Sequence, residues 1–327
     1  MVVLPATPHF TPPQATPTGE ITPEGRFVRQ PNWFTSLITA DGASGYRAEP
    51  GRYQLYASMA CPWAHRALIV RRLLGLEQVI GVTIVDPIRD ERGWRFTTSP
   101  GGRDPLTGAR FLSELYFLTD PGYSARYTVP CVWDTRTRRI VTNDFPQLTV
   151  TLETEFRTWH HPAAPDLYPA GRRGEIDALN TLMYHTVNNG VYKAGFATTQ
   201  AAYEEAFDAL FTTLDALEQR LARRRFLLGD QITEADVRLY PTLARFDAVY
   251  YSHFKCNLRR IVDYPNLWGY ARDLYQRHGF GDTTDFGHIK VHYFQTQPHL
   301  NPSGIVPRGP YANWLAPHGR DHLRQRA

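Results

Sequence analysis

The sequence is poor in cysteine and has no long apolar run. Three cysteines in 327 residues are too few for a disulfide framework, and we expect a reducing compartment to keep them as free thiols. No apolar run approaches the roughly 20 residues that a membrane-spanning helix needs. The first five residues, Met-Val-Val-Leu-Pro, lack the charged start and long apolar core of a signal peptide. These absences argue against a disulfide-stabilised secreted domain and a membrane protein, and they predict a cytoplasmic location.

The chain also lacks a strong excess of charge. Its formal net charge is +4, and its one dense basic run, Arg-Arg-Arg at 223–225, is more typical of the solvated end of a helix than of a nucleic-acid surface. We therefore expect neither nucleic acid nor a membrane as a partner. With 42% hydrophobic residues over 327 positions, the composition is that of an ordinary globular protein of about two domains.

A lone cysteine at the start of a predicted helix is the most distinctive chemical feature. The apolar run 53–56 predicts a strand, and the apolar residues of 67–74 recur at helical spacing. Pro62 is tolerated at the first helical position, which places Cys61 at the N-cap. Backbone N–H groups and the positive end of the helix dipole stabilise a thiolate there. Cys61 is thus predicted to be a nucleophile, whereas the plainer alternative is a buried, inert thiol.

The position where a redox dithiol would carry its second cysteine is Ala64. A mixed disulfide on Cys61 would then have no resolving partner within the motif. An external thiol is the expected resolver.

A proline at the start of a later apolar strand points to the same site. Pro130 follows Val129 in the run 128–134, and a proline there removes a ladder donor. The pattern suggests a cis-proline of the thioredoxin-like kind, which would leave the backbone N–H and C=O of Val129 free to pair with a thiol ligand. We expect Cys131, the next residue, to be core. A hairpin turn at 136–139 and a last strand at 140–141 should follow.

Between these motifs, residues 79–85 predict a buried strand parallel to the first, and residues 86–127 predict a long polar insertion. Loops of that length are usually functional or disordered. Trp94, within it, is either an anchor for the loop or a wall of the pocket over the cysteine.

A helix start follows the last predicted strand. Asp144 or Asn143 is a plausible N-cap ahead of apolar residues at helical spacing. Such a helix start can hold the α-carboxylate and amine of a γ-glutamyl ligand. It can equally be a simple cap.

The second half reads as helical. Helices are predicted up to about 188–190, over 203–221 with five turns of core spacing, and over 233–250 and 264–277. The last fifty residues are predicted to form a long irregular extension, in which His288 and His292 form too thin a set for a metal site. The expected domains are a proline-rich N-terminal arm (1–50), an α/β domain (51–160), an all-helical domain (161–310) and a tail (311–327).

A thioredoxin-like α/β half followed by an all-helical half resembles the glutathione-transferase architecture. Over residues 27–310 the chain resembles the glutathionyl-hydroquinone reductases, the Xi class of glutathione transferases. The motifs that carry this resemblance are Cys-Pro-Trp-Ala-His-Arg at 61–66, Gly-Trp at 93–94, Val-Pro at 129–130, Asn-Asn-Gly-Val-Tyr-Lys-Ala-Gly-Phe at 188–196, Arg-Phe-Asp-Ala-Val-Tyr-Tyr at 245–251, Phe-Lys-Cys-Asn at 254–257 and His-Ile-Lys-Val-His-Tyr at 288–293.

The resemblance implies roles for individual residues. Cys61 would be the nucleophile, and Trp94, Val129 and Pro130 would line the thiol site. The catalytic tyrosines implied by the resemblance would hydrogen-bond the phenolic oxygens of an aromatic substrate; they are Tyr192 and Tyr293, with Tyr251 a weaker candidate.

One motif departs from the family. The γ-glutamyl site of the family usually carries Glu-Ser, and this chain has Asp144 and Phe145 there. The carboxylate is kept but shortened, while a hydroxyl is lost and bulk is added. This change predicts a co-substrate that is either glutathione or another low-molecular-weight thiol, such as γ-glutamylcysteine, mycothiol or bacillithiol.

The resemblance implies an enzyme that removes a thiol from a thiol-conjugated hydroquinone through a mixed disulfide on Cys61, without a metal and as a homodimer. Two alternatives remain. The first is an omega-like thiol transferase acting on mixed disulfides, and the second is a binding module that kept the fold and lost the chemistry.

Overall fold

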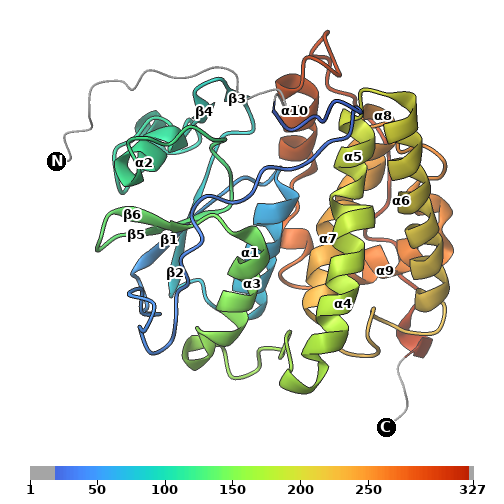
Figure 1. Ribbon diagram of the computed structural model, residues 1–327. Helices are drawn as coiled ribbons and strands as arrows, with labels where there is room; N and C mark the ends of the chain where they lie inside the picture. The colour runs from blue at the N-terminus through green and yellow to red at the C-terminus, as the bar shows by residue number, and fades with distance from the viewer. Residues whose placement is uncertain (1–18, 324–327) are drawn as a thin grey trace. The chain divides into compact units, whose positions relative to one another are not determined.

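The computed structural model describes residues 19–323, which fall into two compact units. The first comprises 31–164 and 287–305, and the second comprises 19–30, 165–286 and 306–323 (Figure 1). The units interleave along the chain, whereas the sequence predicts four consecutive segments. Residues 1–18 of the predicted N-terminal arm lie outside the described residues. Within the described range, no helix is long and apolar enough to cross a lipid bilayer.

The first unit is built on a four-stranded sheet of order β2-β1-β5-β6 (Figure 1). The strands are β1 Tyr53–Ala57, β2 Ile80–Ile84, β5 Cys131–Asp134 and β6 Arg139–Thr142. The predicted parallel pairing of β1 with β2 is confirmed, and β5 and β6 form the predicted antiparallel hairpin. Helices α1 Pro62–Leu73 and α3 Phe145–Thr154 pack together in this unit. This is the thioredoxin-like half that the sequence predicts.

The predicted loop at 86–127 is in fact partly folded. It contains the short strands β3 Arg89–Asp90 and β4 Gly93–Trp94 and the helix α2 Leu112–Thr119. Leu112 and Leu115 of α2 are fully buried, and the Thr119 hydroxyl accepts a hydrogen bond from the Ile140 N–H of β6 at 2.8 Å. The expectation of a polar loop was wrong, because tertiary burial of one apolar face outweighs the flanking Gly and Pro clusters.

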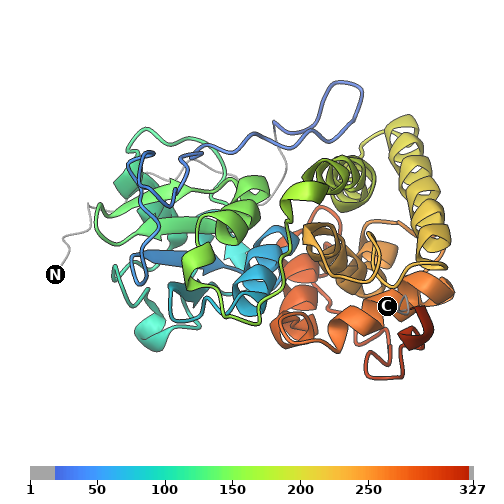
Figure 2. The ribbon, with the colours of Figure 1, turned by 90° about the horizontal axis from the view of Figure 1, so that it is seen from below.

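The second unit is helical, as predicted. Its helices are α4 Arg173–Met183, α5 Gly190–Phe196, α6 Gln200–Leu221, α7 Glu234–Arg245, α8 Tyr251–His253 and α9 Pro265–Tyr275. The view in Figure 2 looks along α4 and α7. The predicted helix end at 188–190 is wrong: a π-helical turn, Tyr184–Asn188, carries the chain into α5. The Asn188 amide donates to Arg238 O and Thr242 Oγ1 of α7, which holds that turn in place.

The last fifty residues contain a helix, so the prediction of an irregular extension is also wrong. Helix α10, Phe286–Thr296, buries Ile289, Tyr293 and Phe294. From residue 287 to 305 this segment belongs to the first unit. A distant part of the sequence therefore completes the thioredoxin-like half.

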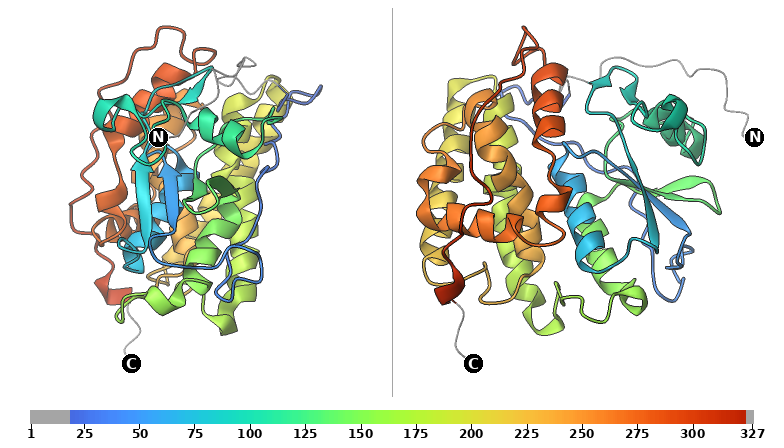
Figure 3. Two further views of the ribbon diagram at one scale, coloured as in Figure 1. Left: turned by 90° about the vertical axis from the view of Figure 1, so that its left-hand side faces the viewer. Right: turned by 180° about the vertical axis from the view of Figure 1, so that it is seen from behind.

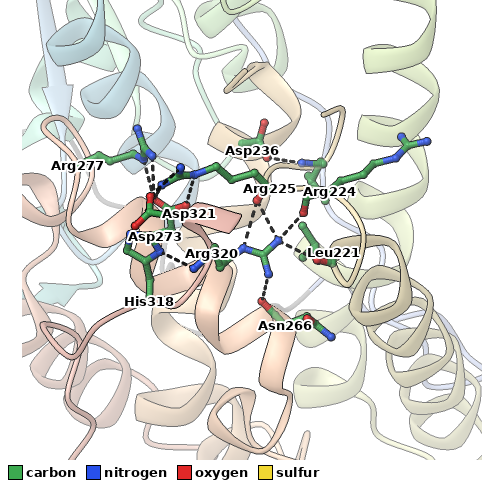
Figure 4. Close-up of polar contacts among 11 residues, drawn as sticks. Leu221, Arg224, Arg225, Asp236, Asn266, Asp273, Arg277, His318, Arg320 and Asp321 are labelled. Atoms are coloured by element: carbon green, nitrogen blue, oxygen red, sulfur yellow. Dashed lines mark hydrogen bonds and ion pairs between the residues drawn. The ribbon is translucent and has the colours of Figure 1, made fainter. Parts of the chain in front are cut away.

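The segment that follows α10 returns to the helical unit and runs beside α9 (Figure 3). The rings of Trp314 and Trp268 lie 4.8 Å apart, and the Gln276 amide donates to the carbonyl of Trp314. The buried Arg320 guanidinium donates to backbone carbonyls of Leu221, Arg224, Arg225 and Asn266 (Figure 4). Because a guanidinium carries five fixed donors, one side chain can serve several loop carbonyls at once and fasten the C-terminal segment.

Candidate functional site

Cys61 is the N-cap of α1, with Pro62 at the first helical position, as the sequence predicts. Its amide donates to Ser58 O at 3.1 Å, and its carbonyl accepts from His65 N at 3.0 Å, so the turn before the helix is closed on both sides. The thiol is half-buried, and its Sγ lies 3.1 Å from the carbonyl oxygen of Val129. The sulfur therefore lies between the start of α1 and the backbone that leads into β5.

The Val129–Pro130 peptide bond is cis, which confirms the prediction. Two residues that the sequence analysis did not assign to this loop hold it. The Tyr116 hydroxyl donates to Thr128 O at 2.7 Å, and the Asn143 amide donates to Thr128 Oγ1 at 2.9 Å. These bonds fix the backbone just before Val129, so the carbonyl next to the sulfur is held by the fold around it. Asn143 was weighed only as a cap, and Tyr116 lies in the segment expected to be a loop.

The other two cysteines are core residues. Cys131 and Cys256 are fully buried, as predicted for Cys131, and burial raises the pKa of both thiols. Buried thiols of raised pKa are inert. Cys61 is thus the one accessible thiol among residues 19–323.

Trp94 is buried at the end of the β3–β4 hairpin. Its ring stacks on that of His292, with centroids 4.9 Å apart and planes 22° apart, and the Arg89 guanidinium carbon lies 5.4 Å from the ring centre. Gly93 has φ = 98°, and a Cβ there would lie 3.0 Å from the Tyr127 ring, so the hairpin requires glycine. The indole N–H is buried and meets no acceptor within the described part of the chain. The ring is an anchor, and its N–H can serve a ligand.

Asp144 is the N-cap of α3, as predicted, but its carboxylate does not bond the first turn. It accepts a hydrogen bond from the Asn32 amide at 3.1 Å. The next side chain, Phe145, is buried against Trp63 of α1, with ring centroids 4.6 Å apart, and the Arg66 guanidinium carbon lies 4.7 Å from the Trp63 ring centre. The first residue of α3 is therefore part of an aromatic stack with a cation over it.

Helix α10 brings Tyr293 and two histidines to the first unit. Tyr293 is buried, with its ring 5.4 Å from that of His292. His288 Nε2 lies 3.4 Å from the hydroxyl of Ser58, in the turn just before Cys61. His292 Nδ1 lies 2.7 Å from Pro87 O. No group of three or more His, Cys, Asp or Glu side chains gathers as a metal site between residues 19 and 323.

The two remaining candidate tyrosines belong to the helical unit. Tyr192 is buried on α5, its hydroxyl 3.5 Å from that of Tyr250, and the Arg29 guanidinium carbon lies 4.8 Å from its ring centre. Tyr251 is half-buried at the start of α8. The sequence analysis assigned no role to Tyr250 or Arg29. The Tyr-Tyr pair at 250–251 was a signal from which Tyr250 could have been named as a candidate.

A thioredoxin-like unit with a cysteine at its first helix start, together with an all-helical unit, defines the glutathione-transferase fold. Two family models match: "Glutathione S-transferase, N-terminal domain" over residues 60–155 and "Glutathione S-transferase, C-terminal domain" over residues 200–273.

Two curated relatives carry a more specific name. The glutathionyl-hydroquinone reductase YqjG of Escherichia coli (strain K12) is 48% identical over 305 residues, which is 91% of this chain and 93% of the relative. The glutathionyl-hydroquinone reductase PcpF of Sphingobium chlorophenolicum is 49% identical over 290 residues, which is 88% of this chain and 90% of the relative.

Solved structures agree. A glutathione transferase from Gordonia bronchialis DSM 43247 is 53% identical with a TM-score of 0.87, covering 89% of this chain and 91% of that one. The glutathione-bound structure of YqjG from Escherichia coli K-12 has a TM-score of 0.84 at 48% identity, covering 88% of this chain and 96% of that one. The chain belongs to the glutathionyl-hydroquinone reductases, the Xi class of glutathione transferases. The predicted fold and resemblance are thereby confirmed.

Proposed function

We propose that this protein is a thiol-dependent reductase that removes a low-molecular-weight thiol from thiol-conjugated hydroquinones. The single observation that carries the proposal is the placement of the Cys61 sulfur, at a helix start and 3.1 Å from the Val129 carbonyl, while both other cysteines are fully buried. One accessible sulfur, with no second accessible cysteine among residues 19–323 to resolve a mixed disulfide, suits a reaction that begins and ends on an external thiol.

The proposed chemistry is a double displacement at sulfur. The Cys61 thiolate attacks the thioether sulfur of the conjugate, and the bond from that sulfur to the ring carbon breaks. The electron pair passes to the ring, which its hydroxyl groups allow to act as an enolate or phenolate, and the carbon then takes a proton. The hydroquinone leaves, and Cys61 holds the thiol as a mixed disulfide. A second thiol, as its thiolate, attacks that disulfide, which releases a symmetric disulfide and the Cys61 thiolate. The ring gains the two electrons that the two thiols lose.

The protein's contribution is to orient the two substrates and to hold protons near the reacting groups. The backbone of Val129 and the indole of Trp94 are proposed to hold the thiol, with Pro130 shaping the backbone turn beside it. Tyr293 and Tyr192 are proposed to hydrogen-bond the phenolic oxygens, where negative charge develops as the ring accepts the electron pair. Tyr251 is a weaker candidate for the same task.

The identity of the thiol is the finer part of the proposal. The thiol is glutathione or a related low-molecular-weight thiol, and Asp144 with Phe145 is proposed to affect how well a γ-glutamyl group is bound. The Asp144 carboxylate keeps a partner for an amine, but Phe145 offers a ring in place of a hydroxyl and is packed on Trp63. We therefore propose glutathione or another low-molecular-weight thiol as the co-substrate, with γ-glutamylcysteine, mycothiol and bacillithiol as the thiols to compare with glutathione.

The test of the function is turnover of a conjugated hydroquinone by Cys61→Ala. We expect the variant to lose turnover with every thiol, because no other described thiol is accessible to form the mixed disulfide. Cys256→Ala, which removes a fully buried thiol, is the matched control and should keep its activity. Unchanged turnover in Cys61→Ala would refute the scheme.

A second function is favoured by the names of other relatives. Proteins of Schizosaccharomyces pombe (strain 972 / ATCC 24843) and Saccharomyces cerevisiae (strain ATCC 204508 / S288c), 45% and 37% identical, are called "Glutathione S-transferase omega-like 2". The same cysteine could reduce mixed disulfides directly. Comparing kcat/KM on a small mixed disulfide with kcat/KM on a conjugated hydroquinone separates the two functions, and the reductase requires the second value to be the larger.

A further inference from the structure

His292 contacts the segment that follows β2 at two residues, Pro87 and Trp94. Its Nδ1 lies 2.7 Å from the carbonyl oxygen of Pro87, at the start of that segment. A carbonyl can only accept, so Nδ1 carries the proton and donates. The imidazole plane also stacks on Trp94, with ring centroids 4.9 Å apart and planes 22° apart. A single side chain of α10 thus fixes both the entry to the β3–β4 hairpin and the tryptophan at its end.

The hairpin itself leaves Trp94 little freedom. Arg89 and Trp94 are cross-strand partners, and the Arg89 guanidinium carbon lies 5.4 Å from the indole ring centre. Gly93, at φ = 98°, turns the backbone immediately before the ring and packs close to Tyr127. With His292 stacked on it, the buried indole is held in one orientation.

That orientation leaves a hydrogen-bond donor unused. The Trp94 indole N–H is buried and meets no acceptor among the described side chains and backbone. Buried donors are almost always paired, so a donor kept in this state points to an acceptor that arrives with a ligand. The guanidinium of Arg89 lies against the same ring and favours an acceptor that is negatively charged, such as a carboxylate.

We propose that His292 is a positioning residue of the thiol site, which orients Trp94 so that its indole N–H meets a carboxylate of the thiol co-substrate. Glutathione, γ-glutamylcysteine and bacillithiol carry such a carboxylate, whereas mycothiol carries none. The proposal rests on the proposed function, which assigns Trp94 to the thiol. His292 does not touch the reacting sulfur in this scheme. Its loss should therefore weaken capture of the thiol and leave the chemistry at Cys61 intact.

The experiment compares three substitutions at this position. His292→Ala removes the stack and the hydrogen bond, His292→Phe keeps only a ring to stack, and His292→Asn keeps only an N–H near the position of Nδ1. Gln295→Ala, on an exposed position of the same helix, is the matched control. We expect His292→Ala to raise the thiol KM about tenfold with kcat within about twofold of wild type. The Phe and Asn variants should each recover part of that loss, and the control should show none.

A second readout does not depend on hydroquinone turnover. The symmetric disulfide of the best carboxylate-bearing thiol of the panel is added to each protein, and the rate of mixed-disulfide formation on Cys61 is followed by mass spectrometry. We expect a roughly tenfold slower rate at subsaturating disulfide in His292→Ala, recovered in part by the Phe and Asn variants.

Folded His292→Ala protein with wild-type thiol KM and wild-type thiolation rate would overturn the proposal, as would a fall in kcat at unchanged KM. If His292→Ala does not fold, the Phe and Asn variants carry the same comparison. Suppose that Cys61 is thiolated faster in the wild type than in His292→Ala, but that the wild type releases no hydroquinone. That result would refute the proposed function alone.

Discussion

The three cysteines have the same side chain, but the fold places them in different surroundings. Cys131 lies in β5 and Cys256 in the helical unit, both fully buried, and burial raises the pKa of each thiol because the charged form loses its hydration. Cys61 is half-buried at a helix start, where N–H groups converge. We therefore expect Cys61 to be the reactive thiol of the three.

Alkylation with iodoacetamide tests this difference. At pH 7 we expect Cys61 to be modified and Cys131 and Cys256 to stay unmodified until the protein is unfolded. The rate at Cys61, followed against pH, should report an apparent pKa below the ordinary value of about 8.5. Peptide mapping assigns the sites. A Cys61 rate that rises only above pH 8.5 would favour a binding module that kept the fold and lost the chemistry.

The pair Asp144 and Phe145 is a second residue-scale determinant. Phe145→Ser removes the ring that packs on Trp63 and adds a hydroxyl at the start of α3. We expect kcat/KM for glutathione to rise about tenfold relative to that for mycothiol, which has no γ-glutamyl group, because a hydroxyl that can donate and accept replaces an obstructing ring. The same thiol panel on both proteins gives the ratio. A ratio that stays the same or falls would remove Phe145 as the determinant, provided that the melting temperature shows a folded variant.

At the scale of elements, local signals sufficed where one element carries its own pattern. The Cys-Pro turn, the cis Val129–Pro130 bond and the long helix α6 follow from neighbouring residues. Helices α2 and α10 were missed, because their burial depends on partners far away in the sequence. His292 of α10 meets Pro87 and Trp94, about two hundred residues earlier, and no local spacing indicates that contact.

A buried ion pair of the helical unit gives a prediction on stability. Asp273 of α9 is buried, which by itself raises its pKa, but hydrogen bonds and charge from Arg225 and Arg277 outweigh burial and hold the pKa below its ordinary value (Figure 4). A lowered folded-state pKa stabilises the fold above the ordinary pKa of about 3.9, and that contribution is lost as the pH falls through the folded-state pKa.

Asp273→Asn should therefore lower the free energy of unfolding at pH 7 by about 3 kcal/mol, since it leaves the buried Arg225 guanidinium with only the exposed carboxylate of Asp321. The difference from wild type should shrink below about pH 4. Urea unfolding at both pH values measures it. Asp263→Asn, in the exposed pair with Arg260, is the control and should cost much less. Equal losses in both variants would contradict this account of the pair.

At the scale of the whole molecule, the sequence predicted the two kinds of structure but not how the chain distributes them. Residues 19–30 belong to the helical unit and residues 287–305 to the thioredoxin-like unit, an exchange that no composition shift marks. The Cys61 helix start and the cis bond after Val129 were predictable, since both lie in short recognisable motifs, and the thiol site built on them with Trp94 stays a proposal. The contacts of Tyr116, Asn143 and His292 with the neighbouring segments were not predictable, because each is a tertiary hydrogen bond or stack. The homodimer and the cytoplasmic location stay predictions.

The most direct test of the central claim is a single turnover without free thiol. Protein and an equimolar thiol-conjugated hydroquinone are mixed, and intact-mass spectrometry with peptide mapping is run alongside hydroquinone detection. The account predicts one hydroquinone released for each Cys61 that gains the mass of the thiol, and removal of that adduct when free thiol is added. Hydroquinone released with no adduct on Cys61 would contradict it.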